Sequence, residues 1–284
     1  MHQPVFVAAN DPKFFTHTFI LYSVKQHQDV ARYTLLASDG SFYLGQKQCR
    51  AEQLKFMSQL QLTQDIYEEL PKEKFFPLLN TETIKVFTGP VESSYFKRQN
   101  VTISETYSPC YLKFLMRELL SVEEVAKNPH PNICEYRGAV VNEISGRVVG
   151  LAYKGYTIDL WKFAGSKRLV AQTQIDKIVE GVAAGLKHLH AHGLVHCDVH
   201  PGNIFLTVVP GPGMGAVETV EEVVLGDFDA CRKAGERIRG KLAAPAWIGH
   251  AWVSGSKAVF DIDLCALESV KRWLGSKMVQ KKKA

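Results

Sequence analysis

Two short polar segments in the second half of the chain contain side chains that could do chemistry. Residues 196–203 read HCDVHPGN, and residues 226–229 read GDFD. A carboxylate can accept a proton, and carboxylate and amide oxygens are the hard ligands that Mg²⁺ prefers. The alternative is a pair of turns in which the Asp and Asn side chains only cap backbone amides.

The elements on either side of these segments are expected to hold them in place. Apolar residues recur every three or four positions from Ile175 to Leu189, which predicts a buried helix that ends at a left-handed Gly193. Strands are predicted over 204–209 and 222–225, and a PGPGMG insertion at 210–215 separates them. The first polar segment therefore lies between a helix and a strand, and the second directly follows a strand.

Both segments resemble parts of one family. The spacing of the first is HxDxxxxN, as in the catalytic loop of protein kinases, and GDFD resembles their magnesium-binding DFG element with its Gly replaced by Asp. Over about half its length the chain thus resembles a diverged member of the eukaryotic-type protein-kinase-like superfamily. The resemblance implies that Asp198 accepts the proton of the attacking hydroxyl, while Asn203 and Asp227 hold one or two Mg²⁺ ions on ATP. It also implies that His196 braces the loop.

A helix predicted over 108–127 is followed by another sign of this family. Residues 128–133 read NPHPNI and resemble the HPNI turn that follows the regulatory helix of eukaryotic-type protein kinases. Glu118 is then the candidate for the glutamate that forms an ion pair with the ATP-contacting lysine. An ordinary solvated glutamate is the alternative.

The ATP-contacting lysine has no clear motif, because the chain contains no VAIK element. Lys85, on a strand predicted over 83–87, is the expected residue. A different alignment of Gly89 and Pro90 would place Thr88 there and leave no cation for the α and β phosphates.

Antiparallel hairpins are expected in the first half of the chain. The β-prone runs between residues 16 and 44 surround Asp39-Gly40, a dipeptide suited to a type I′ turn; a loop that covers nucleotide phosphates is the alternative. Two further runs, 133–141 and 147–153, predict a second hairpin. It ends at Tyr153, where the resemblance implies the hinge whose backbone binds adenine.

Two features beyond the second polar segment resemble the same family. Residues 243–247, AAPAW, resemble a diverged GTxxW or APE region, the motif that ends the activation segment. Asp263, on a helix predicted over 261–274, resembles the buried aspartate that ties down the backbone of the catalytic loop. The alternatives are a Trp247 that is simply core and an Asp263 that only favours the helix dipole. The helix is expected to turn Leu264, Leu267 and Trp273 inward.

Three differences from protein kinases also matter. His200 stands where they usually carry the Lys that touches the transferred phosphoryl group, and HxDxHPxN is similar to aminoglycoside and choline phosphotransferases. Cys197 replaces the Arg that pairs with a phosphorylated activation loop in many of them. The stretch from Asp227 to Trp247 contains no Ser, Thr or Tyr, so we expect no switching by phosphorylation there.

The composition is that of an ordinary globular protein, with 46% hydrophobic residues among 284. The net charge of +5 is concentrated only in a lysine-rich tail, which favours a solvated end over a nucleic-acid contact. Six widely spaced cysteines without a CxxC pair argue against a zinc site or a disulfide framework. The sequence shows neither a signal peptide nor eighteen consecutive apolar residues, so an intracellular, cytoplasmic protein without a membrane span is expected.

Together these observations predict an α+β, two-lobed protein-kinase-like fold with a small antiparallel-sheet N-lobe and a truncated, mainly helical C-lobe. The expected parts are an N-terminal extension over 1–80, an N-lobe over 81–152 and a C-lobe over 153–284. The expected function is Mg²⁺- and ATP-dependent phosphoryl transfer to a protein hydroxyl, with the hydroxyl of serine or threonine as the expected acceptor. Two alternatives stay open: a catalytically impaired pseudokinase that acts as a binding module, and a small-molecule kinase of the aminoglycoside phosphotransferase type. The oligomeric state does not follow from the sequence.

Overall fold

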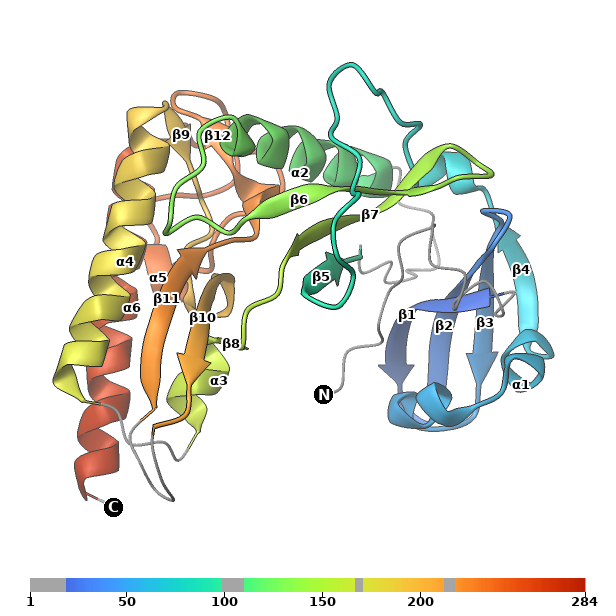
Figure 1. The fold of residues 1–284 in the computed structure, drawn as a ribbon, viewed down its shortest axis with the longest axis horizontal. Helices are drawn as coiled ribbons and strands as arrows, with labels where there is room; N and C mark the ends of the chain where they lie inside the picture. The colour runs from blue at the N-terminus through green and yellow to red at the C-terminus, as the bar shows by residue number, and fades with distance from the viewer. Residues whose placement is uncertain (1–18, 99–109, 167–170, 212–217, 284) are drawn as a thin grey trace. The chain divides into compact units, whose positions relative to one another are not determined.

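The computed structural model describes residues 19–98, 110–166, 171–211 and 218–283 (Figure 1). The chain divides into two compact units: residues 1–123 with 136–154 form the first unit, and residues 124–135 with 155–284 form the second. The beginnings of the elements predicted from residues 16 and 108, and most of the insertion at 210–215, lie outside the described residues. Within the described ranges, no helix combines the length and the apolar character needed to cross a bilayer.

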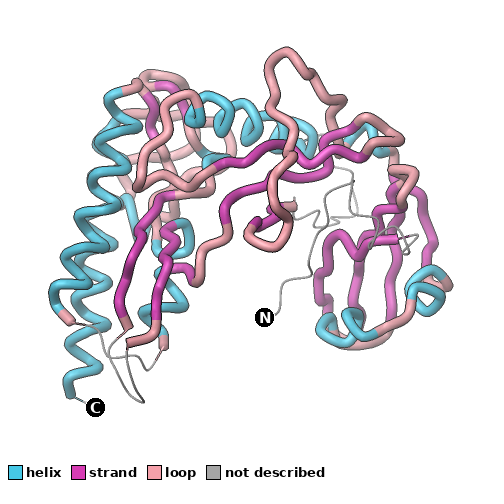
Figure 2. Tube along the Cα trace, viewed as in Figure 1, coloured by secondary structure: helices cyan, strands magenta, loops and turns pink. Residues whose placement is uncertain are grey.

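Four antiparallel strands form the first sheet of the first unit, in the order β1-β2-β3-β4 (Figures 1 and 2). They are β1 (Phe19–His27), β2 (Val30–Ala37), β3 (Phe42–Lys47) and β4 (Ile66–Leu70); a 3₁₀ helix (Ala51–Phe56) and α1 (Gln59–Thr63) connect β3 to β4. Tyr33 on β2 is buried together with Leu54 and Leu62 of this connection. The Tyr33 hydroxyl donates a hydrogen bond to the carbonyl of Leu62 (2.7 Å), which fixes the connection to the sheet.

The hairpin expected at Asp39-Gly40 is present between β2 and β3, but its turn is not of type I′. A type I′ turn needs positive φ at both central residues, and of these two only Gly40 has it (φ 84°). The N–H of Gly40 donates to the Ala37 carbonyl (3.0 Å), and the N–H of Ala37 donates to the Ser41 carbonyl (2.8 Å). The connection is therefore a three-residue loop that ends in a left-handed glycine.

The second sheet of the first unit has the antiparallel order β5-β7-β6. Its strands are β5 (Ser94–Lys97), β6 (Tyr136–Asn142) and β7 (Arg147–Lys154); α2 (Cys110–Ala126) lies between β5 and β6 in the sequence, and a 3₁₀ turn (Lys72–Lys74) precedes them. The second predicted hairpin is confirmed as β6 and β7. The strand predicted over 83–87 is wrong: a turn covers 81–83, and the rest of the run forms only a single bridge, between Val86 and Ala139.

The second unit combines helices with a three-stranded sheet, β11-β10-β8, and a two-stranded sheet, β12-β9. Its helices are α3 (Leu160–Gly165), α4 (Gln172–Ala191), α5 (Pro245–Ile248) and α6 (Phe260–Lys283). Its strands are β8 (Ile158–Asp159), β9 (Leu194–Val195), β10 (Ile204–Val209), β11 (Thr219–Leu225) and β12 (Arg232–Lys233). The long helices α4 and α6 lie side by side, and α4 also packs on β11 (Figure 1).

The apolar faces of these two long helices decide which of their residues face the core. The helix predicted from Ile175 to Leu189 is confirmed within α4, and Gly193 follows it with φ 70°. The buried apolar stripe of α6 consists of Ile262, Ala266, Val270 and Leu274. The expectation that Leu264 faces inward is wrong: it lies about 200° around the helix from Ile262 and is 48% exposed. Leu267 and Trp273 are partly buried.

Candidate functional site

The first polar segment is closed by hydrogen bonds between its own residues. It connects β9 to β10 and ends in a 3₁₀ turn (Pro201–Asn203). The amide nitrogen of Asn203 donates to the Asp198 carbonyl (2.9 Å) and to Asp198 Oδ2 (3.3 Å), and both side chains are buried. Because the amide nitrogen faces Asp198, the amide oxygen is the Asn203 atom that remains to ligate a cation.

The backbone of this loop is held by a carboxylate on α6. Asp263 is fully buried, and its two oxygens accept the N–H groups of His196 (2.8 Å) and Cys197 (2.9 Å). One of these oxygens also lies 2.9 Å from His190 Nε2. Cys197 has φ 65°, a conformation that residues other than glycine seldom adopt. The expectation that Asp263 ties down the loop is confirmed, and a charge that only favours the helix dipole would not account for these bonds.

The second polar segment is tied to the first through Gly226. The Gly226 N–H donates to the Asn203 carbonyl (2.9 Å), and the Gly226 carbonyl lies 3.1 Å from His196 Nε2. A Cβ at Gly226 would come within 3.0 Å of the Phe205 side chain, so a larger residue would have to displace that ring. Asp227 follows in the left-handed conformation (φ 64°). The segments that carry the three candidate residues are thus one connected network.

An ammonium group that was not predicted from the sequence lies at the centre of this network. Lys241 Nζ is 3.0 Å from Asp198 Oδ2, 3.2 Å from Asp227 Oδ2 and 2.9 Å from Asp229 Oδ1. Lys241 is one of 34 Lys and Arg residues, and no periodicity or motif distinguishes it from the others. Only the path of the chain after Asp227 brings it to these carboxylates.

The charges of this cluster stabilise one another. Burial acts to raise the pKa of the Asp198 carboxyl, but His200 and the Lys241 ammonium outweigh it and hold that pKa below its usual value. Burial likewise acts to lower the pKa of Lys241, but the carboxylates of Asp227, Asp198 and Asp229 raise it above its usual value. Both side chains are therefore charged at neutral pH.

His200 faces the other oxygen of the same carboxylate. Its Nε2 lies 3.7 Å from Asp198 Oδ1, and its Nδ1 accepts the N–H of Gly202 (3.1 Å). A neutral ring therefore carries its proton on Nε2, the nitrogen that faces Asp198. The ring also stacks on Trp247 of α5, with 6.5 Å between centroids. Trp247 is only partly buried, so it is not simply a core residue.

In the first unit, the candidate glutamate of α2 forms a buried ion pair. Glu118 is 4% exposed, and it lies on the same helix face as the buried Leu115, Leu119 and Val122. A carboxylate on an apolar face needs a partner, and the ammonium of Lys97 on β5 lies 2.6 Å from Glu118 Oε1. The alternative of an ordinary solvated Glu118 does not agree with this burial.

The partner of Glu118 corrects our choice of lysine. Lys85 is exposed. Its backbone N–H donates to a different glutamate of α2, at Glu123 Oε1 (2.9 Å). Lys97 ends the SYFK run that forms β5 and stands 21 positions before Glu118. This β-prone run could have identified Lys97 from the sequence, but only its pairing with β7 distinguishes it from the run around Lys85.

Tyr153 lies beside this ion pair. It is the second-last residue of β7, its side chain is buried, and its hydroxyl donates to Glu118 Oε1 (3.3 Å). Its ring also contacts that of Tyr136, with 5.7 Å between centroids. The side chain therefore has a structural role at Glu118, and the adenine contact expected of its backbone stays a prediction.

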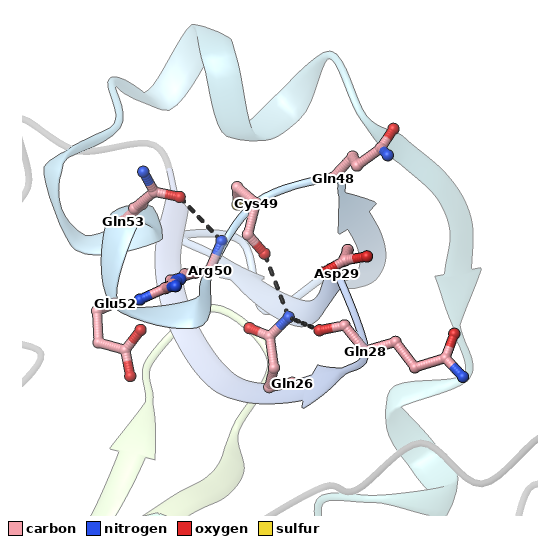
Figure 3. A pocket seen from close by; sticks show the side chains of 8 residues that line it. All are labelled: Gln26, Gln28, Asp29, Gln48, Cys49, Arg50, Glu52 and Gln53. Carbon is pink, nitrogen blue, oxygen red and sulfur yellow. Dashed lines mark hydrogen bonds between the residues drawn. The ribbon is translucent and has the colours of Figure 1, made fainter.

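A hollow of about 480 Å³ lies elsewhere in the first unit, at the end of the β1–β2 hairpin (Figure 3). Its lining is polar and consists of Gln26, Gln28, Asp29, Gln48, Cys49, Arg50, Glu52 and Gln53. The Gln26 amide there donates to the carbonyls of Gln28 (2.6 Å) and Cys49 (3.3 Å), so it joins two loops of the protein to each other. None of the candidate residues lines this hollow.

The donor set at the polar segments fits a magnesium ion. Asp227 offers a carboxylate and Asn203 an amide oxygen, and Mg²⁺ commonly takes one or two such ligands beside waters and phosphate oxygens. The Lys241 ammonium at Asp227 shows that positive charge is favoured at this point. Among the described residues, no group of three or more His, Cys, Asp or Glu side chains is arranged to hold a metal by itself.

Comparison with curated proteins finds serine/threonine kinases. The chain is 30% identical over 130 residues to human "Serine/threonine-protein kinase TAO3" and 35% identical over 107 residues to "Serine/threonine-protein kinase TAO2" of Xenopus laevis. These alignments cover 46% and 38% of the chain, but only 13% and 9% of the two kinases. Among solved structures, one from the yeast RNA Pol II CTD kinase CTDK-1 complex aligns with 96% of the chain and 66% of its own, at 12% identity and a TM-score of 0.48.

The model of one protein family covers more than half of the chain. It describes the protein kinase domain and matches residues 97–267. The match begins at Lys97 and includes Glu118, both polar segments and Asp263. These residues form the ion pair and the hydrogen-bond network described above. The chain therefore belongs to the protein kinase domain family.

Proposed function

We propose that this chain is a Mg²⁺- and ATP-dependent phosphotransferase that acts on a protein hydroxyl of the Ser/Thr type. The observation that carries the proposal is the network in which the Asn203 amide binds Asp198 while the Gly226 N–H joins the segment of Asp227 to the Asn203 carbonyl. Phosphoryl transfer needs a placed carboxylate and a placed cation more than covalent chemistry, and this network would provide both. The names of the matched relatives favour serine or threonine as the acceptor.

In this proposal each side chain has one task. Asp198 accepts the proton of the acceptor hydroxyl, and its lowered pKa keeps it ionised for that purpose. Asn203 and Asp227 would hold Mg²⁺, which when bound neutralises phosphate charge. His200 presents its Nε2 to the same carboxylate, and His196 keeps the two segments together.

The ion pair of the first unit would serve nucleotide binding. We assign to Lys97 the phosphate contact that we had expected of Lys85, because the buried Glu118 holds its ammonium in place. Tyr153 supports the same carboxylate through its hydroxyl.

A second candidate is a catalytically impaired kinase domain that binds partners. It is favoured by the Lys241 ammonium, which already neutralises the carboxylates that a metal ion would use, and by the lack of a GxGxxG motif in the sequence. The small-molecule kinase alternative depends only on His200 and its HxDxHPxN context.

Turnover measurements separate these candidates. ADP release should require Mg²⁺ and a protein acceptor such as casein, and Asp198→Asn should lower it roughly 10²- to 10⁴-fold. Asp176→Asn, at an exposed position on α4, is the matched control and should leave the rate unchanged. Nucleotide binding without turnover would favour the binding module, and turnover only with aminoglycosides or choline would favour the small-molecule kinase.

A further inference from the structure

We propose that Lys241 is the residue whose positive charge meets the phosphoryl group during transfer. This inference rests on the proposed function and extends it to a residue that neither the motifs nor the family match singles out. Lys241 Nζ contacts both the candidate base Asp198 and the candidate metal ligand Asp227.

Lys241 lies close enough to Asp198 for this role. A hydroxyl that gives its proton to Asp198 lies within one hydrogen bond of that carboxylate, and Lys241 Nζ is 3.0 Å from one of its oxygens. Two hydrogen bonds that share a carboxylate span roughly 5–6 Å. The phosphoryl group that the hydroxyl attacks is thus within reach of a flexible lysine side chain.

Lys241 also has enough N–H donors for this role. An ammonium has three N–H groups, and Lys241 directs them to three carboxylates, those of Asp198, Asp227 and Asp229. A metal ion held by Asp227 would take the place of Lys241 at that carboxylate and leave one N–H donor of Lys241 free for another acceptor. A phosphate oxygen at the same place can accept this N–H, because an ammonium–phosphate hydrogen bond is charge-assisted like the ammonium–carboxylate bond that it replaces.

Hydrogen bonds of the backbone on both sides of Lys241 hold it in this position. The N–H of Ala243, two residues later, donates to the Cys197 carbonyl of the first polar segment (2.9 Å). On the other side, the buried Arg232 donates to the carbonyls of Cys231 (2.7 Å) and Arg239 (3.1 Å), which closes the loop that begins at Asp227. The ammonium is therefore presented by a fixed loop and is not a chance contact of an exposed side chain.

His200 does not compete for this role. Its Nε2 lies 3.7 Å from Asp198 Oδ1, and a neutral ring has a single donor there. Lys241 brings a full charge to Oδ2 of the same residue at a shorter distance. A lysine at position 200 would approach Asp198 from the side of Oδ1, opposite Lys241, and could supply a positive charge to the phosphoryl group from that side.

The test is the preference for ATP over ADP, which reports the contact to the terminal phosphoryl group and needs no turnover. Both affinities are measured by calorimetry in Mg²⁺ for the full chain and for Lys241→Met, Lys241→Arg and Lys233→Met. Lys233 is an exposed lysine on β12 and serves as the matched control. We expect Lys241→Met to lower the preference roughly tenfold at unchanged ADP affinity, as the loss of one charge-assisted bond implies.

Further variants decide whether charge is the property that matters. Lys241→Arg should keep most of the preference, and adding His200→Lys to Lys241→Met should restore part of it. The proposal is overturned if Lys241→Met leaves both affinities unchanged. It is also overturned if Lys241→Met raises the affinities for ATP and ADP equally and lowers the Mg²⁺ concentration that binding requires, because Lys241 would then compete with the metal ion. An ATP preference that depends on Lys241 in a chain without turnover would support the contact between Lys241 and the terminal phosphoryl group while contradicting the proposed function.

Discussion

The carboxylate of Asp263 accepts the backbone N–H of Cys197, and Cys197 has a left-handed conformation that a side chain makes unfavourable. Such a conformation costs on the order of 1–3 kcal/mol and persists only where its surroundings enforce it. The same aspartate binds the N–H of His196, so one side chain of α6 sets the path of the chain immediately before Asp198. The position of the candidate base therefore depends on a residue far away in the sequence.

We expect Asp263→Ala to destabilise the protein by about 2–4 kcal/mol, because it leaves two buried N–H groups without an acceptor. The free energy of unfolding from urea titration measures this. Asp261→Ala is the matched control, since Asp261 lies in the same helical turn but is exposed, and it should cost at most about 1 kcal/mol. Equal losses in both variants would contradict the role of Asp263.

Lys97→Met should weaken ATP binding roughly tenfold and lower the stability by about 1–3 kcal/mol. The reason is that Glu118 would stay buried without its ammonium partner. Lys97→Met combined with Glu118→Gln should recover part of the stability but not the ATP affinity. Lys85→Met is the control and should change neither quantity. If it weakens ATP binding while Lys97→Met does not, Lys85 and not Lys97 contacts the phosphates.

The stability of the second unit should fall as the pH drops below neutrality. Burial, together with the nearby His188, lowers the pKa of His130 below its usual value, so the unfolded chain binds a proton that the folded chain does not. The loss begins near the unfolded pKa of about 6.5 and grows until the folded pKa is passed. Melting temperatures between pH 7.5 and 5 should show a smaller decline for His130→Gln. His250→Gln, at an exposed position, should not alter it.

Two buried thiols beside the polar segments should be chemically inert. Burial raises the pKa of Cys231 to about 12 and also raises that of Cys197, so neither forms the reactive thiolate at pH 8. Cys265 is exposed and should react with a maleimide before either of these two thiols. Mass spectrometry of the digested adduct measures this order. Labelling of Cys231 before Cys265 in the folded protein would mean that its surroundings open readily.

The parts of the fold that the sequence predicts are those set by local patterns. The apolar period from Ile175 to Leu189 identifies α4, and the polar segments could be located because Asp198 and Asn203 lie only five positions apart. The kinase resemblance and the α+β class are confirmed for the same reason, since motif spacing and element order can be read along the chain.

The parts that escape prediction depend on contacts between distant segments. The runs around Lys85 and Lys97 are both β-prone, and only pairing with β7 selects the second. Lys241 meets Asp198 across 43 positions of sequence, through a loop closed by Arg232 and by Ala243. Leu264 shows the same limit within one helix, because only the packing of α6 tells which of its apolar residues face the core.

The most direct test of the central claim is a calorimetric ATP titration of the intact chain with and without Mg²⁺, repeated for Asp227→Ala. If Asp227 and Asn203 hold a nucleotide-bound metal ion, Mg²⁺ should raise the ATP affinity of the native protein at least about tenfold. The variant should lose this increase while its melting temperature stays close to that of the native protein. An equal Mg²⁺ dependence in both proteins would contradict the account.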